Sequence, residues 1–121
     1  MNLLVAAAWP AHVHHPAADA WITANPRFAT CGLTELGLVR VLMVHGAEPS
    51  AAFRRLAAFV AENRARLIPA DLGGVAAHGV TGHRQTTDFY LARLAAAHRL
   101  TLATFDRALA GRFPEHCELV A

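Results

Sequence analysis

Three of the few carboxylates in this sequence lie where a divalent cation could be held. Glu35 is followed by Val39 and Leu42 at helical spacing, so its side chain is expected to point toward the protein interior. Asp88 lies in the first turn of a strongly apolar helix, and Asp106 directly follows an apolar strand. Carboxylates that lie close together repel one another unless a cation sits among them. Mg²⁺ or Mn²⁺ would relieve this repulsion, because hard divalent ions prefer oxygen ligands.

Each acid taken singly also has an ordinary structural explanation. Asp88 at the start of a helix is favoured by the helix dipole, and Asp106 can cap the helical turn that follows it. Glu35 is harder to explain in this way, because a carboxylate in an apolar helix is costly when it is buried without a partner. One shared ion would account for all three acids together.

The segments around these acids alternate between strands and helices. Apolar runs predict short strands at 3–8, 27–31, 66–71, 100–106 and 117–121. Helical patterns occur in 14–26, 32–46, 51–64 and 86–99, with shorter helical pieces in 72–84 and at 107–110. This order predicts an α/β protein, a three-layer sandwich with a mostly parallel central sheet and helices on both faces. In such sheets ligands bind at the carboxyl ends of the strands, where the acids are expected.

Several local details follow from the same patterns. The helix in 32–46 is apolar almost all round and is expected to be buried on most sides, with Gly46 ending it. Ser50 is expected to cap the next helix, and Thr86 or Thr87 the helix that carries Asp88.

Composition limits the class of protein. The 121 residues predict a single domain over 1–121, and 55% hydrophobic with 17% charged residues argues against disorder. The net charge of +2 does not by itself favour a nucleic-acid partner. The two cysteines of the chain form no CxxC pair, so we expect no disulfide framework and a cytoplasmic location. No apolar run approaches the roughly 20 residues of a membrane span, so we expect a soluble protein.

Four segments together resemble one known family. The segments "FATCGLTELGLVRVL", "GHRQTTDFYLARLA" and "LATFDRAL", in this order and at these separations, are similar to the PIN-domain ribonucleases, specifically the VapC-type toxins of toxin–antitoxin pairs. The segment "AWPAHVHHPAADAW" resembles one branch of that family, so the resemblance covers nearly the entire chain. It implies a metal-dependent endoribonuclease that uses Mg²⁺ or Mn²⁺. By position, Glu35, Asp88 and Asp106 match three of the family's four catalytic, metal-binding acids.

The resemblance also implies partners. We expect an RNA substrate, a cognate antitoxin protein that wraps the toxin, and a homodimer, with no membrane association. The class of RNA that is cut stays open, because transfer, ribosomal and messenger RNA would all suit an acidic pocket of this kind.

The fourth acid of the family ends the first strand, two positions before a polar residue. Asn2 matches that polar position and Met1 the middle one, so the acid would precede the start of this sequence. We therefore expect the first strand to be truncated, with the chain beginning two or more residues late. The alternative is a catalytically impaired PIN-fold binding module that only engages an antitoxin, because the first-strand Asp is absent.

Further polar residues are weaker candidates for the site. Arg40, His83, Arg84 and Arg107 could contact RNA phosphates, since arginine offers a bidentate fork to them. Thr104, like Asn2, could lie near the metal, although a β-branched residue in a strand needs no function.

Histidines and tryptophans near the N-terminus have other expected roles. His12, His14 and His15 lack the i, i+3 or i+4 spacing of zinc ligands on a helix, so a polar loop is preferred for them. Trp9 and Trp21 lie in apolar surroundings and are expected in the core or an interface.

Overall fold

Two compact units make up the chain in the computed structural model, which describes residues 2–120 and their side chains from residue 3 on. Unit 1 ends at Pro69, and unit 2 begins at Ala70. The single domain expected over 1–121 stays a prediction. Within the described residues, no helix has the length and apolar character needed to cross a membrane.

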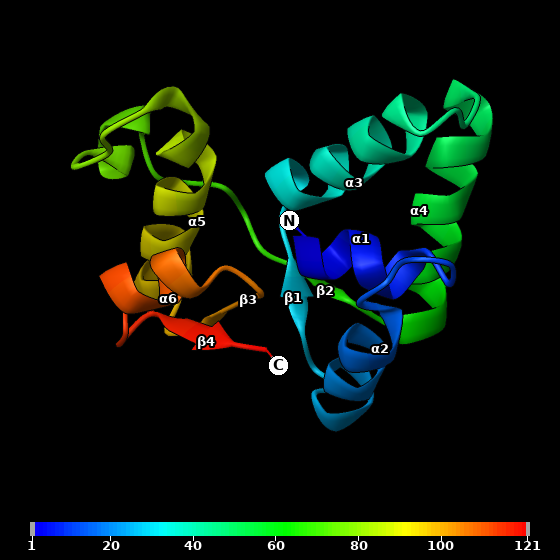
Figure 1. Cartoon of the computed structure of the whole chain (residues 1–121), viewed down its shortest axis with the longest axis horizontal. Coiled ribbons are helices and arrows are strands. Elements are labelled where there is room, and N and C mark those ends of the chain that lie inside the picture. The colour runs from blue at the N-terminus through cyan, green and yellow to red at the C-terminus, as the bar shows by residue number, and fades with distance from the viewer. Residues whose placement is uncertain (1, 121) are drawn as a thin grey trace. The chain divides into compact units, whose positions relative to one another are not determined.

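Unit 1 is built mostly from helices. It contains α1 (Asn2–Ala8), α2 (His15–Ala24), α3 (Gly32–Val44) and α4 (Pro49–Asn63), together with strands β1 (Ala29–Thr30) and β2 (Arg66–Leu67). The two strands pair in parallel, with Ala29 opposite Arg66 and Thr30 opposite Leu67. Helix α1 packs against α2, α3 and α4 (Figure 1). The core of unit 1 therefore forms around α1.

The expected strand at 3–8 is wrong, because these residues form helix α1. Burial of the segment is nevertheless as expected, since every side chain from Leu3 to Ala8 is buried. A continuous apolar run cannot be assigned to strand or buried helix by periodicity alone. Three alanines and two leucines in "NLLVAAA" are strong helix formers, and their propensity favours the helix.

Helix α3 differs from expectation in its burial. Leu38 and Val39 are buried, but Leu36 is 58% and Val44 76% exposed. The helix is thus covered on one side rather than on most sides. Its end agrees with the prediction, because Gly46 follows it at a positive φ of 99°, a conformation that favours glycine.

Helix α4 does not begin with the expected serine cap. It starts at Pro49, and the preceding Glu48 makes no side-chain capping hydrogen bond. Proline suits the first helical position because the N–H that it lacks would have no partner within the helix.

Unit 2 carries two short 3₁₀ turns and an α/β arrangement. Its elements are η1 (Gly74–Ala77), η2 (His83–Gln85), α5 (Thr86–Ala97), β3 (Leu102–Thr104), α6 (Arg107–Arg112) and β4 (Cys117–Leu119). Strands β3 and β4 pair in parallel, from Leu102 opposite Cys117 to Thr104 opposite Leu119. Residues of α5, α6 and β4 share one core, which consists of Phe89, Ala92, Leu109, Phe113 and Cys117. Leu102, the first residue of β3, packs against this core, which therefore joins α5 to the strand pair.

The α/β class and the parallel pairing of strands are confirmed. All described strands are two or three residues long, and they form two separate two-stranded sheets. The larger central sheet of a three-layer sandwich stays a prediction.

Candidate functional site

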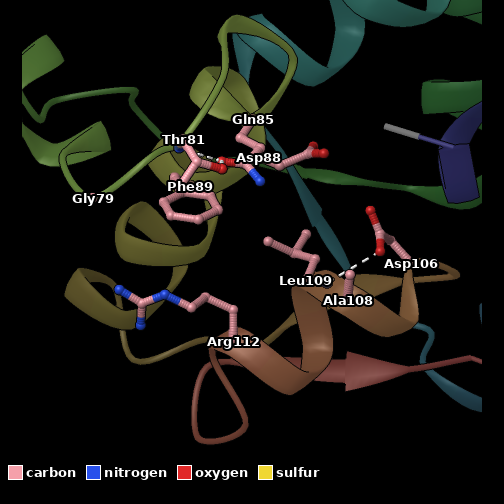
Figure 2. A pocket seen from close by; sticks show the side chains of 9 residues that line it. All are labelled: Gly79, Thr81, Gln85, Asp88, Phe89, Asp106, Ala108, Leu109 and Arg112. Atoms are coloured by element: carbon pink, nitrogen blue, oxygen red, sulfur yellow. Dashed lines mark hydrogen bonds between the residues drawn. The ribbon is translucent and has the colours of Figure 1, made fainter.

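A cavity of about 270 Å³ in unit 2 brings two of the three predicted acids together (Figure 2). Asp88 comes from α5, and Asp106 lies between β3 and α6. The remaining lining residues come from the loop before α5, from α5 itself and from α6: Gly79, Thr81, Gln85, Phe89, Ala108, Leu109 and Arg112. The cavity therefore lies where a helix N-terminus and the end of a parallel strand converge.

Asp88 is placed by the loop that leads into α5. It lies in the first turn of this helix, as predicted, and is partly buried. The side chain of Gln85 closes the loop, because its Oε1 accepts hydrogen bonds from the backbone N–H and the hydroxyl of Thr81, at 2.7 and 3.2 Å. Within residues 3–120, no hydrogen bond to the carboxylate of Asp88 is formed. Its oxygens thus remain available to a ligand in the cavity.

The expected threonine cap of α5 is wrong. Gln85 occupies the cap position without a side-chain capping bond, and the hydroxyl of Thr86 instead donates to the carbonyl oxygen of His83 at 2.9 Å. The η2 turn immediately before α5 supplies this carbonyl, so Thr86 stabilises the turn rather than the first free N–H groups of the helix.

Asp106 is fixed by two hydrogen bonds of different kinds. Its backbone N–H donates to Oγ1 of Thr104 at 3.0 Å, and its Oδ1 accepts from the backbone N–H of Leu109 at 3.1 Å. Asp106 is therefore the N-cap of α6, which confirms the structural role considered for it. The cap uses one carboxylate oxygen, and Oδ2 accepts no hydrogen bond from the described part of the chain.

The two carboxylates influence each other electrostatically. Burial raises the pKa of Asp88 above its usual value, and the negative charge of Asp106 raises it further. Both charges also reach Cys117 in the core beneath them: burial raises the pKa of this thiol, and Asp88 and Asp106 add to the effect. Two acidic side chains therefore share one site, and ionisation of Asp88 is disfavoured there.

These features suit a bound divalent cation. Mg²⁺ is typically held by one or two carboxylates together with waters and substrate phosphates, so two acids form a sufficient protein contribution. A cation there would favour the ionised form of Asp88, whose pKa is raised mainly by burial and to a smaller extent by the charge of Asp106. Within the described residues, no cluster of three or more His, Cys, Asp or Glu side chains has the geometry of a metal site.

Glu35 belongs to unit 1. It lies in the first turn of α3 and is partly buried. The hydroxyl of Thr30, at the end of β1, donates to its Oε2 at 2.6 Å. The carboxylate of Glu35 thus has the hydrogen-bond partner that a partly buried acid requires. That partner lies at the carboxyl end of a strand, where ligands were expected to bind.

Other candidate residues have different surroundings. Arg40 on α3 is exposed, as are His83 and Arg84 in η2 and Arg107 at the start of α6. All four are accessible to a large ligand. The side chain of Asn2 lies outside those that the structure describes. Thr104 accepts a hydrogen bond from the backbone of Asp106, so its proximity to this acid is observed, while its relation to a metal stays a prediction.

Histidines near the N-terminus are engaged locally. His15 donates from Nδ1 to the carbonyl oxygen of Ala6 at 2.7 Å, and the ring of His12 packs edge-on against Trp9, with 5.8 Å between ring centroids. Trp21 contacts the buried ring of Phe28 at 6.3 Å. Both tryptophans are partly buried and pack against neighbouring rings inside unit 1, and the position in the core or an interface expected for them stays a prediction.

Gly79 and Arg112 are among the seven lining residues that were not anticipated from the sequence. Gly79 has a positive φ of 90° and lies beside the guanidinium group of Arg112. A glycine in "AHGVTG" and a basic residue in the last turn of a six-residue helix were the available signals. Neither signal reveals which cavity the residue lines, because that depends on how the loop packs against α5 and α6.

Comparison with known proteins places the chain in a family. No family model matches the sequence, and no solved structure matches it. Three curated relatives come from Mycobacterium tuberculosis. Ribonuclease VapC29 is 44% identical over 112 residues, covering 90% of this chain and 84% of the relative. Ribonuclease VapC39 is 36% identical over 122 residues (91% and 88%), and Ribonuclease VapC38 is 40% identical over 115 residues (88% and 82%). With relatives this similar along nearly its whole length, the chain belongs to the VapC-type PIN-domain family.

Proposed function

We propose that this protein is the toxin of a toxin–antitoxin pair and a Mg²⁺- or Mn²⁺-dependent endoribonuclease that hydrolyses RNA phosphodiester bonds. The observation that carries the proposal is the shared cavity of Asp88 and Asp106, in which two carboxylates repel each other. Family membership supports the activity, because the curated relatives are named ribonucleases.

Different residues of this chain would have different roles in the reaction. Asp88 and Asp106 would hold the divalent ion, with Glu35 as a third acid. A bound ion of this kind supplies an activated water and neutralises charge on the phosphate that is cut. Thr104 holds the backbone of Asp106 and so sets the position of its carboxylate. Four exposed residues would attract the RNA strand: Arg40, His83, Arg84 and Arg107.

Partners follow from the same family membership. We propose a cognate antitoxin that covers the toxin, a homodimer and a cytoplasmic location. Four large apolar side chains on α3 are at least 40% exposed: Leu33, Leu36, Met43 and Val44. Such a row of apolar residues on one helix is typical of a protein–protein interface, which supports partner binding in unit 1.

A second candidate is a PIN-fold module that binds the antitoxin without cutting RNA. One observation favours it: the carboxylate of Asp106 caps α6 through Leu109, a role that needs no metal. The two candidates differ in whether RNA is cleaved, so a single assay separates them.

The experiment measures cleavage of a mixed RNA pool by the purified protein with Mg²⁺, with Mn²⁺ and with excess chelator. We expect cleavage with either ion and none in chelator. Asp88→Asn should abolish cleavage while the fold is kept, since the two side chains are nearly isosteric. The matched control is Glu115→Gln, which neutralises an exposed carboxylate in unit 2 and should cut like the wild type. Absence of cleavage by the wild type with both ions would favour the binding module.

A further inference from the structure

We propose that Arg112 binds a phosphodiester of the RNA strand next to the one that is cut, and so holds the strand across the acidic cavity. The inference rests on the proposed function, because it describes how the same cavity takes its substrate. Arg112 lines this cavity together with Asp88 and Asp106. Figure 2 shows its guanidinium group apart from both carboxylates, with Phe89 and Leu109 between. One cavity thus offers two sites of opposite charge.

The guanidinium group of Arg112 is held in place by two aromatic rings. Its Cζ atom lies 5.7 Å from the ring centroid of Phe89 and 5.1 Å from that of Phe113. These two rings pack edge to face, with 4.8 Å between centroids and 88° between planes, and both are buried. Cation–π contact with a rigid pair restricts the long side chain before any ligand arrives. Less conformational entropy is therefore lost when an anion binds.

Gly79 permits this position of Arg112. A Cβ atom at residue 79 would lie 3.4 Å from Nη2 of Arg112 and 3.8 Å from Nη2 of Arg93. The positive φ of 90° at Gly79 also disfavours any residue with a side chain. Two guanidinium groups thus converge on one backbone position that carries no side chain.

Arg93 and Arg112 differ in what they already bind. Arg93 donates from Nη1 to the carbonyl oxygens of Ala76 and His78, both at 2.6 Å, so it ties the loop before α5 to the helix. Arg112 is exposed, and within residues 3–120 it forms no hydrogen bond and no ion pair. The positive charge of Arg93 is likewise not paired with a carboxylate in the described part of the chain. The donors of Arg112 are therefore available, in a locally positive environment.

An RNA phosphate fits these properties. The planar fork of arginine matches two oxygens of a phosphate, and such contacts fix the register of a strand without reading its sequence. The cavity volume of about 270 Å³ lies just below the usual range for small-molecule pockets, so it suits a short piece of extended backbone. Acids that hold a cation at one phosphate and an arginine at the next would align the strand for cleavage.

The test measures binding without cutting. The probe is a short fluorescein-labelled single-stranded RNA of mixed sequence, titrated in excess chelator and followed by fluorescence anisotropy at several KCl concentrations. Arg112→Gln should weaken binding about tenfold, as expected for a lost charged hydrogen-bond donor. It should also reduce the slope of log affinity against log salt concentration by about 0.7. The matched control is Arg54→Gln, which removes an exposed arginine of α4 in unit 1. This variant should not show the tenfold loss of affinity.

Arg112→Lys is a second variant that keeps the test valid if Arg112→Gln does not fold. It keeps the charge and loses the fork, so its affinity should lie between those of the wild type and Arg112→Gln. Should Arg112→Gln fail to fold, a wild-type affinity of Arg112→Lys would overturn the inference. Equal affinity and salt slope for a folded Arg112→Gln would overturn it too, even with metal-dependent cleavage intact. Conversely, an Arg112-dependent affinity in a protein that never cuts RNA would reject the proposed function and leave this contact standing.

Discussion

Oγ1 of Thr104 accepts a hydrogen bond of 3.0 Å from the backbone N–H of Asp106. The last residue of β3 thereby sets the conformation of the acid two residues later, at the point where α6 begins. Asp106 in turn caps α6 through Leu109. One hydroxyl group therefore controls both the direction of a candidate metal ligand and the start of a helix.

Replacing this hydroxyl should impair the site more than the fold. In Thr104→Val the shape is kept and the acceptor is lost, so we expect the rate of RNA cleavage to fall about 10- to 100-fold, as for other residues that orient metal ligands. Thr104→Ser keeps the acceptor and should stay close to the wild type. Cleavage rates at several Mg²⁺ concentrations are the measurement, and wild-type rates for the valine variant would show that the bond is only structural.

Thr30 should have the corresponding role in unit 1. Its hydroxyl donates to Oε2 of Glu35 at 2.6 Å, and Thr30 is only 5% exposed. Thr30→Val removes this donor, so we expect unfolding free energy to fall by about 1 kcal/mol and cleavage to fall with it. Thr30→Ser is the control. A cleavage rate unaffected in a folded Thr30→Val would argue against Glu35 as a positioned metal ligand.

The ionisation of Asp88 should cost stability in the metal-free protein. Since its pKa is raised in the fold, mainly by burial, the folded state binds protons more tightly than the unfolded chain. Stability should therefore fall as the pH rises through the unfolded pKa of about 3.9 and toward the raised folded value. In chelator at pH 7, Asp88→Asn should melt at a higher temperature than the wild type.

Below the unfolded pKa of Asp88 this advantage of Asp88→Asn should vanish, because the acid is then protonated in both states. Thermal melts monitored by circular dichroism at pH 3 and pH 7 provide the comparison, with Glu115→Gln as the exposed control. If Asp88→Asn melted below the wild type at pH 7 in chelator, the electrostatic cost assigned to Asp88 would be wrong.

Tyr90 should stabilise unit 2 without taking part in chemistry. Its buried ring brings the hydroxyl to the carbonyl oxygen of Leu72, which accepts a hydrogen bond at 2.8 Å. Tyr90→Phe should lower the free energy of unfolding by about 1 kcal/mol, since the carbonyl loses its donor. Urea denaturation measures the change. The cleavage rate of the folded variant should match that of the wild type, and a large loss would place Tyr90 nearer the reaction than we propose.

The sequence predicted helices better than strands. Patterns in 32–46, 51–64 and 86–99 matched α3, α4 and α5 within a few residues, because apolar spacing and glycine or asparagine at the ends are local signals. The segment 3–8 failed for the opposite reason. Its unbroken apolar run predicts burial, which is observed, but leaves helix and strand undecided until its neighbours are known.

The site was predicted correctly for residues whose place follows from their position relative to a helix or strand. Asp88 and Asp106 were expected at a helix start and a strand end, and both line one cavity. The contribution of Arg112 could not be predicted, because it depends on two phenylalanine rings and a glycine from separate segments meeting in space. Caps were also unreliable, since Thr86 had a carbonyl of the preceding turn within reach.

Direct measurement of Mn²⁺ binding tests the central claim, that Asp88 and Asp106 together hold a divalent ion. Isothermal titration calorimetry of Mn²⁺ into the wild type, Asp88→Asn, Asp106→Asn and the control Glu115→Gln would compare their affinities without requiring RNA. Our account predicts saturable binding by the wild type and the control, and loss of at least tenfold in affinity in each aspartate variant. Binding of Mn²⁺ with unchanged affinity in both aspartate variants, or no binding by the wild type, would contradict it.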